Sequence, residues 1–303
     1  MKYLRLIRVH QWIKNVFVFV PLLFSLNLFD EKYFLTAFFA FLVFCLASSS
    51  IYVINDLVDI DSDRAHPTKK NRPLPSGQIS KQSAIITASL LLVIVFWLMM
   101  YFNYQFILLT VAFVALNVLY SFWLKNLVLL DVFSIAAGFS LRVLAGAFVI
   151  QVPISSWLLL TTMFISLFLG VMKRRSELVL VSESFNNNPF ANGQNEIPET
   201  QSRKVLAEYS LNFADQMATV AAAGVIISYA LYSVAPRTIS IFQTERLIYT
   251  TPFVVFGIFR YMYLEYKSRK GENTTRILAT DFPMIADVVI YIVTTIMIIY
   301  KII

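Results

Sequence analysis

Long apolar stretches, separated by shorter polar ones, dominate the pattern of this chain. A helix needs about 20 mostly apolar residues to cross the hydrocarbon core of a membrane. The first candidate stretch is the weakest, because Lys14, Asn15 and Pro21 interrupt it; since no convincing signal-peptide cleavage site follows Ser25, we expect a retained helix. The nine predicted spans are Ile13–Leu28, Tyr33–Ile54, Ala84–Tyr101, Phe106–Leu124, Leu127–Ile150, Ile154–Met172, Phe213–Val234, Leu247–Leu264 and Phe282–Ile303.

Composition supports this interpretation. The 303 residues are 58% hydrophobic and only 14% charged, with a mean hydropathy of +0.69. Soluble domains average roughly 45–50% apolar and about 25% charged residues, so an ordinary soluble globule is excluded. The 27 Phe and 15 Tyr exclude a disordered chain. We therefore expect an all-α polytopic membrane protein that forms one domain over residues 1–303.

The distribution of Lys and Arg predicts the orientation in the membrane. Most of the 25 basic residues fall in the N-terminal segment and in the loops after the even-numbered spans. Because cytoplasmic loops are rich in Lys and Arg, we expect a cytoplasmic N-terminus, an external C-terminus and chemistry on the cytoplasmic face, as in a bacterial inner membrane. The net charge of +7 suits anionic lipids, phosphorylated substrates or nucleic acid. The hydropathy favours the first two and makes nucleic acid an unexpected partner.

An acidic motif follows the second predicted span, with four Asp and one Asn in nine residues. Asn55, Asp59 and Asp63 recur at i, i+4 and i+8, which places them near one face of a continuing helix, with Asp56 beside it. Acids at a helix C-terminus oppose the macrodipole and repel one another, and a divalent cation relieves both effects. Carboxylate and amide oxygens suit Mg²⁺, which usually joins one or two carboxylates to substrate phosphates. The motif therefore predicts a magnesium site.

Basic residues come directly after these acids. His66, Lys70 and Arg72 precede Pro73, which ends the helical pattern. Acids that hold a metal, followed by cations that hold phosphate oxygens, are typical of a diphosphate site. The alternative is a solvated cytoplasmic loop. It accounts for the lysines but not for the concentration of acids.

The pattern Asn55-Asp56-x-x-Asp59-x-x-x-Asp63, followed by His66-Pro67 and Arg72-Pro73, resembles the first signature of the UbiA-type intramembrane prenyltransferase superfamily. The resemblance covers essentially the whole chain. It implies a helical bundle around a central cavity that is open to the cytoplasmic side and to lipid. It also implies that Asn55, Asp59 and Asp63 hold Mg²⁺, with Asp56, Asp59 and Asp63 as the catalytic acids.

The second signature of that superfamily, an acidic DxxxD at the end of the sixth span, is changed here. The corresponding residues are Lys173, Arg174, Arg175 and Glu177, so that one acid remains among three cations. We expect this region to bind an anion directly rather than through a second metal cluster. The alternative is that cations at a cytoplasmic helix end satisfy the helix dipole and the membrane topology. That explanation accounts for one or two of the three.

Two further motifs resemble one branch, the decaprenyl-phosphate phosphoribosyltransferases. They are Arg8-x-x-Gln11-Trp12-x-Lys14-Asn15 and Asp131…Gly138-Phe139-x-x-Arg142-x-x-Ala145-Gly146. The branch implies transfer of the 5-phosphoribosyl group from phosphoribosyl diphosphate to a polyprenyl phosphate. These substrates carry a diphosphate, a 5-phosphate and a lipid phosphate. One Mg²⁺ site and several separate cations suit three such anionic groups.

Three of the charged residues within the predicted spans are candidate site residues. Arg142 lies eleven residues after Asp131, about 16 Å deeper, where an Arg costs at least about 2.5 kcal/mol unless it faces a cavity or a partner. It binds phosphate or pairs with an acid such as Asp287. Lys14 either reaches the membrane interface or contacts substrate, and its motif favours substrate. Asp287 is the third candidate.

The predicted mechanism is displacement at C1 of the ribose, with Mg²⁺ on the departing diphosphate. The predicted substrate-binding residues are Lys14, Lys70, Arg72, Arg142, Lys173, Arg174, Glu177 and Asp287. One alternative is a prenyltransferase that joins a prenyl diphosphate to an aromatic or other acceptor. It would need a second metal site. Another is a transporter, in which the intramembrane charges mark an ion path, although no internal repeat supports it.

Overall fold

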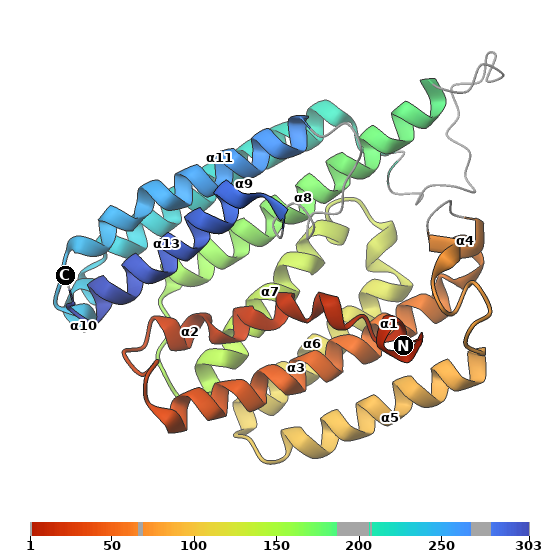
Figure 1. Cartoon of the computed structure of the whole chain (residues 1–303), viewed down its shortest axis with the longest axis horizontal. Helices are drawn as coiled ribbons and strands as arrows, with labels where there is room; N and C mark the ends of the chain where they lie inside the picture. The colour runs from red at the N-terminus through yellow and green to blue at the C-terminus, as the bar shows by residue number, and fades with distance from the viewer. Residues whose placement is uncertain (1, 66–68, 187–205, 207, 268–279, 303) are drawn as a thin grey trace. The chain divides into compact units, whose positions relative to one another are not determined.

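The computed structural model describes residues 2–65, 69–186, 206, 208–267 and 280–302 (Figure 1). Over these ranges the regular structure is helical, with no strand, which confirms the all-α prediction. The helices are α1 (Lys2–Leu6), the 3₁₀-helix η1 (Val9–Phe19), α2 (Val20–Leu23), α3 (Glu31–Val58), α4 (Ile60–Ala65), η2 (Lys69–Asn71), α5 (Lys81–Met99), α6 (Tyr104–Phe122), η3 (Leu124–Asn126), α7 (Leu130–Val149), α8 (Ser156–Asn186), α9 (Leu211–Val234), α10 (Pro236–Phe242), η5 (Arg246–Thr250), α11 (Thr251–Lys267) and α13 (Phe282–Ile299).

Eight helices of the described chain are long and apolar enough to cross a membrane, and they coincide with eight of the nine predicted spans. The chain is an integral, multi-pass membrane protein. The predicted and observed ends differ by a few residues, except that α8 continues from the expected end at Met172 to Asn186. The basic residues after Met172 therefore lie on a helix rather than in a loop.

The first predicted span, Ile13–Leu28, is not a continuous α-helix. It forms most of the 3₁₀-helix η1 and then α2, whose first turn contains Pro21. Pro lacks a backbone N–H and is tolerated in a first turn. At about 2.0 Å per residue in η1 and 1.5 Å in α2, the two helices extend about 28 Å, close to a membrane thickness. A ninth crossing stays a prediction.

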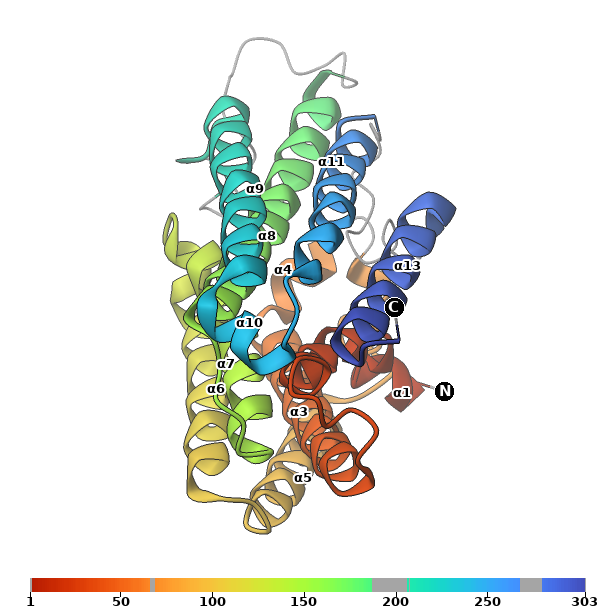
Figure 2. The ribbon, with the colours of Figure 1, turned by 90° about the vertical axis from the view of Figure 1, so that its left-hand side faces the viewer.

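The helices fall into two compact units, with α1 to α7 in unit 1 and α8 to α13 in unit 2. In unit 1, α3 lies against η1, α5, α6 and α7 (Figure 2). Its core centres on Phe44, whose ring lies 5.9 Å from that of Phe106 and 5.0 Å from that of Phe113. A second apolar cluster, with Ile60 and Leu74 buried in it, supports the segment after α3. The single domain and the central cavity stay predictions.

Unit 2 is built on the pairs α8 with α9 and α11 with α13. Side-chain caps begin its helices: the Ser210 hydroxyl accepts from Phe213 N at 3.1 Å before α9, and the Asp281 carboxylate accepts from Met284 N at 3.0 Å before α13. Asp281 also accepts two bonds from Arg260 of α11, at 3.1 and 2.8 Å. These hydrogen bonds hold the pKa of the Asp281 carboxyl below its usual value.

Candidate active site

The acidic motif begins where α3 ends. Because α3 has 28 residues, it extends about 42 Å and is longer than a hydrocarbon core is thick. Asp59 separates α3 from α4, yet its N–H donates to Asn55 O at 2.9 Å and the Asp63 N–H donates to Asp59 O at 2.8 Å. Helical hydrogen bonds thus continue through the junction, and the four residues keep helical spacing.

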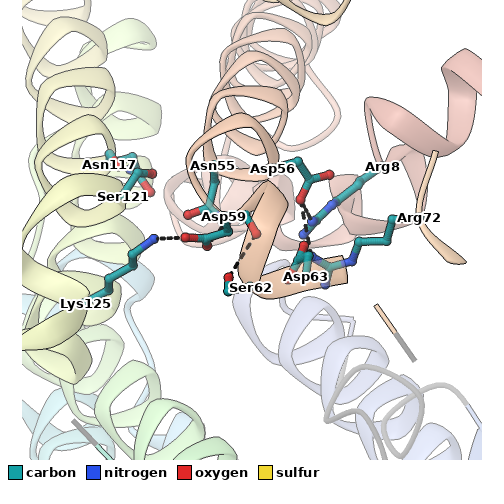
Figure 3. Close-up of polar contacts among 10 residues, drawn as sticks. All are labelled: Arg8, Asn55, Asp56, Asp59, Ser62, Asp63, Arg72, Asn117, Ser121 and Lys125. Carbon is teal, nitrogen blue, oxygen red and sulfur yellow. Dashed lines mark hydrogen bonds and ion pairs between the residues drawn. The ribbon is translucent and has the colours of Figure 1, made fainter. Parts of the chain in front are cut away.

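The polar residues of the motif form two groups (Figure 3). At about 100° per residue, Asn55 and Asp59 differ by about 40° around the helix, whereas Asp56 and Asp63 differ by only about 20°. Accordingly, Asn55 Nδ2 donates to Asp59 Oδ2 at 3.1 Å. Asp56 and Asp63, respectively 1% and 3% exposed, share the side chain of Arg72 instead. Asp63 therefore aligns with Asp56 more closely than with Asn55.

Two arginines neutralise the Asp56–Asp63 group. Arg72 Nη1 lies 3.3 Å from Asp56 Oδ1 and 2.6 Å from Asp63 Oδ2. Arg8, directly before η1, forms a second ion pair with Asp56. Sequence reasoning placed Arg72 beside the acids but did not count Arg8 among the site residues. The only sequence signal for Arg8 was its place in the motif Arg8-x-x-Gln11-Trp12.

A lysine of η3, the 3₁₀-helix that follows α6, neutralises the other group. Lys125 forms an ion pair with Asp59, and the two side chains are 8% and 20% exposed, respectively. Asn117 and Ser121 of α6 lie on the same side of Asp59 as Lys125 (Figure 3). Sequence reasoning treated Lys125 only as a loop cation. The spacing Asn117, Ser121, Lys125, at i, i+4 and i+8 in an apolar segment, was a signal that could have found it.

Other residues of the predicted diphosphate site lie near Arg72 in sequence. Lys70 is exposed on η2, two residues before Arg72. His66 and Pro67 of the signature lie outside the described residues. Arg72 itself is supported by the turn that follows, where the Ser76 hydroxyl donates to Arg72 O at 2.6 Å and Pro73 is buried.

The donor chemistry of Asn55, Asp59 and Asp63 fits a hard divalent cation. They supply one amide and two carboxylates on successive helical turns, and Mg²⁺ commonly uses one or two carboxylates together with substrate oxygens. Within the described ranges, no group of three or more His, Cys, Asp or Glu forms an all-protein metal cage. The three residues therefore fit a metal whose remaining ligands come from a substrate. These ligand assignments stay predictions.

The two basic residues predicted in the membrane, Lys14 and Arg142, both belong to unit 1. Arg142, on α7, is 6% exposed and donates to Asn15 Oδ1 at 2.8 Å and to Gly138 O at 3.0 Å. Within unit 1 these hydrogen bonds go to neutral groups, and the pairing with Asp287 of unit 2 stays a prediction. Lys14 is half-buried on η1, next to Asn15.

In unit 2, the changed second motif lies on one turn of α8. Lys173 is exposed, whereas Arg174 is 1% exposed and lies 2.5 Å from Glu177 Oε2. Arg175 pairs with Asp215 of α9 at 2.6 Å and stacks on the ring of Tyr266 of α11, 3.9 Å from its centroid. Arg175 therefore joins three helices, while Lys173 and Arg174 keep their predicted phosphate-binding roles as untested assignments.

Asp287 is 9% exposed on α13 and points towards α11. A Cβ at Gly257 would lie 3.1 Å from Asp287 Oδ2, so the absence of a side chain at Gly257 leaves room for the carboxylate. The substrate-binding role predicted for Asp287 stays a prediction.

Comparison with known proteins identifies the family. The model described as the UbiA prenyltransferase family matches residues 16–174, more than half of the chain. The chain belongs to the UbiA prenyltransferase family. The match contains the acidic motif, Lys125 and the start of the changed second motif. This confirms the resemblance noted in the sequence.

Named relatives refine the placement within the UbiA family. The decaprenyl-phosphate phosphoribosyltransferase of Mycolicibacterium smegmatis is 32% identical over 76% of this chain and 69% of that protein. The protein of the same name from Mycobacterium tuberculosis is 30% identical over 75% of this chain and 72% of its own length. A solved UbiA homologue from Archaeoglobus fulgidus, bound to GPP and Mg²⁺, covers 99% of this chain and 100% of its own, with a TM-score of 0.70 and 17% identity. At that identity, the last comparison shows the fold alone.

Proposed function

We propose that this chain transfers the 5-phosphoribosyl group from phosphoribosyl diphosphate to a polyprenyl phosphate and releases diphosphate in a Mg²⁺-dependent reaction. The observation that carries the proposal is the charge balance of the acidic motif. Three cations, Arg8, Arg72 and Lys125, form ion pairs with its acids Asp56, Asp59 and Asp63. Cations held beside the acids in this way can bind substrates that carry several separate anionic groups. The names of the relatives support the same activity.

The donor diphosphate is assigned to the acidic motif. Asn55, Asp59 and Asp63 would hold Mg²⁺, which, when bound, supplies positive charge that stabilises the departing diphosphate. Arg72, 31% exposed, and the exposed Lys70 bind diphosphate oxygens from the adjoining segment. Asp56 holds Arg8 and Arg72 in place, so its contribution to catalysis is to orient these cations.

Lys125 exchanges partners in this proposal. Its side chain is only 8% exposed, so its ammonium group requires a counter-ion at all stages. In the structure, that counter-ion is Asp59. An anionic donor beside Asp59 provides a second one, and the carboxylate becomes available to the metal. Lys125 therefore joins the predicted substrate-binding residues.

The remaining cations are assigned to the remaining phosphates. In unit 1, Lys14 is assigned to a further phosphate. In unit 2, Lys173 and Arg174 keep their predicted phosphate-binding roles, and Glu177 pairs with Arg174. The lipid phosphate is already an anionic nucleophile at neutral pH and needs no strong general base. Positive charge develops on the ribose ring as the diphosphate leaves, as in other glycosyl transfers.

The proposed topology places the N-terminus and the acidic motif on the cytoplasmic side of a bacterial inner membrane, with the C-terminus outside. Phosphoribosyl diphosphate is highly charged and does not cross a membrane unaided. A cytoplasmic site gives such a donor direct access. Cysteine-accessibility labelling of Lys81→Cys and Tyr101→Cys, at opposite ends of α5, tests the orientation.

The test of function is a donor comparison with purified chain in lipid nanodiscs, polyprenyl phosphate and Mg²⁺. We expect diphosphate release from phosphoribosyl diphosphate only when the lipid phosphate is present, together with a phosphoribosylated lipid. The second candidate is prenyl transfer, which the description of the UbiA prenyltransferase family favours. Efficient prenylation of an aromatic acid, without phosphoribosyl transfer, would establish that candidate and refute ours.

A further inference from the structure

A buried polar cluster, separate from the acidic motif, attaches the N-terminal segment to the long helices of unit 1. Asn15 of η1 is fully buried, and its Oδ1 accepts hydrogen bonds from Arg142 Nε of α7 at 2.8 Å and from Ser48 Oγ of α3 at 3.1 Å. Its Nδ2 donates to Cys45 Sγ of α3 at 3.4 Å. One side chain of η1 thus joins two long helices. We call Asn15, Ser48 and Arg142 the anchor.

The guanidinium of Arg142 is fixed on all sides. Besides its bond to Asn15, it donates to Gly138 O at 3.0 Å and approaches Ser48 Oγ at 3.5 Å. Its carbon centre lies 4.5 Å from the ring centroid of Phe113 and 5.0 Å from that of Phe139. A cation inside a membrane protein is costly unless its surroundings satisfy it, and these neutral groups do so. These contacts fix the Arg142 guanidinium in the position from which it binds Asn15.

The backbone of η1 also lies very close to α7. A Cβ at Gly146 would fall 2.1 Å from Val18 O, so only glycine allows this approach without a shift. Towards α3, Trp12 Nε1 donates to Ser49 Oγ at 2.9 Å. Contacts on both sides therefore determine the position of η1.

The conformation of the segment requires such support. η1 continues as a 3₁₀-helix for eleven residues, whereas runs longer than three or four are uncommon because their hydrogen-bond geometry is poorer. Arg8, directly before η1, has φ +52°, in the left-handed region that residues with a Cβ adopt at a cost. Both are local conformations that tertiary contacts must maintain.

The helix type decides where Arg8 lies. Arg8 precedes Asn15 by seven residues, and a 3₁₀-helix rises about 2.0 Å per residue against 1.5 Å in an α-helix. Relaxation of this stretch to an α-helix would shorten it by about 3.5 Å and withdraw Arg8 from Asp56. Ser48 lies about 16 Å from Asp59 along α3, so the anchor acts on the acids through the segment and not by contact.

We propose that the anchor is a positioning device: it keeps η1 in its 3₁₀ form, so that Arg8 stays on Asp56 beside Arg72, which also binds Asp63. Asn15, Ser48 and Arg142 are positioning residues that act through Arg8. This proposal rests on the proposed function only for its activity measurement. It assigns to Arg142 a role other than phosphate binding.

A double-mutant cycle between Asn15→Ala and Arg8→Gln tests the proposal. We expect each single variant to lower kcat/KM for phosphoribosyl diphosphate about tenfold, and the double variant to lose little more than either. A merely structural role would make the two losses multiply, which would overturn the proposal. Should Asn15→Ala fail to fold, Ser48→Ala replaces it, because it removes one hydroxyl only. Ser50→Ala is the matched control, since the equally buried Ser50 donates to Ala88 O of α5 at 3.0 Å.

A measurement without substrate separates this proposal from the proposed function. Hydrogen–deuterium exchange over residues 9–19 should rise at least about threefold in Ser48→Ala and Asn15→Ala and stay at the wild-type rate in Ser50→Ala. Unchanged exchange in the anchor variants refutes the positioning role, whatever the donor proves to be. If the wild-type chain does not turn over phosphoribosyl diphosphate, the proposed function is refuted. The exchange rates over residues 9–19 then test the positioning role of the anchor by themselves.

Discussion

The ion pair between Lys125 and Asp59 leads to the sharpest prediction about the metal site. Lys125→Met keeps the length of the side chain and removes its charge, leaving Asp59 without that partner. Removing one partner of a buried pair costs about 3–5 kcal/mol. Since the Asp59 side chain is 20% exposed, water screens the remaining charge, and we expect about 2 kcal/mol. For a chain of 303 residues, that loss lowers Tm by about 3 °C in the absence of Mg²⁺.

Added Mg²⁺ should stabilise Lys125→Met more than the wild type. In the wild type the lysine competes with the metal for Asp59, and the variant lacks that competitor. A tenfold gain in Mg²⁺ affinity raises the metal-linked stabilisation by about 1.4 kcal/mol at saturation. At the same time, loss of the proposed phosphate contact should lower kcat/KM for phosphoribosyl diphosphate at least about 30-fold. The variant thus gains metal response and loses activity.

The assay is thermal unfolding in detergent with and without saturating Mg²⁺, followed by steady-state kinetics. Lys81→Met is the matched control, because Lys81 is exposed at the start of α5. It should match the wild type in all three measurements. If Lys125→Met shows the same Mg²⁺-dependent rise in Tm as the control and keeps kcat/KM within threefold, neither the metal site at Asp59 nor the exchange of partners is correct.

Three further predictions concern other parts of the chain. Asp59→Asn or Asp63→Asn should abolish turnover while the protein still inserts and folds; near-normal rates in saturating Mg²⁺ would contradict the metal assignment. Arg174→Ala should lower kcat/KM at least about 30-fold. Arg175→Ala, which removes the contacts of α8 with Asp215 of α9 and Tyr266 of α11, should chiefly lower Tm. If both variants lower kcat/KM by the same few-fold factor, the basic cluster reflects membrane topology only. Gly146→Ala should cost about 1–3 kcal/mol, because its Cβ meets a backbone oxygen; an unchanged Tm would contradict the close approach of η1.

The helices were predictable because each long apolar stretch has few alternatives in a membrane. Within such a stretch, every backbone group must be satisfied internally, so length and apolarity suffice to place α3, α5 and the others. The first stretch was harder. It contains Asn15 and Pro21 and forms a 3₁₀-helix followed by a short α-helix. Contacts of Asn15 with α3 and α7 support this conformation, and the sequence alone does not show them.

The internal grouping of the acidic motif differs from the prediction. Spacing at i and i+8 suggested that Asp63 shares a face with Asn55, while the closer match at i+7 joins it to Asp56. The partners Arg8 and Lys125 lie 48 and 66 residues from their acids along the chain. Only tertiary packing brings such distant residues together, so the periodicity of the acidic motif itself did not predict these two partners.

Donor choice tests the central claim most directly. Purified chain, Mg²⁺ and polyprenyl phosphate are incubated with phosphoribosyl diphosphate or with a prenyl diphosphate, and the lipid product is identified by mass spectrometry. The charge balance of the acidic motif and the basic residues of α8 predict a phosphoribosylated lipid and one equivalent of diphosphate, with prenyl diphosphate a poor donor. Prenyl transfer at a comparable or higher rate, with no phosphoribosylated lipid, would contradict the account.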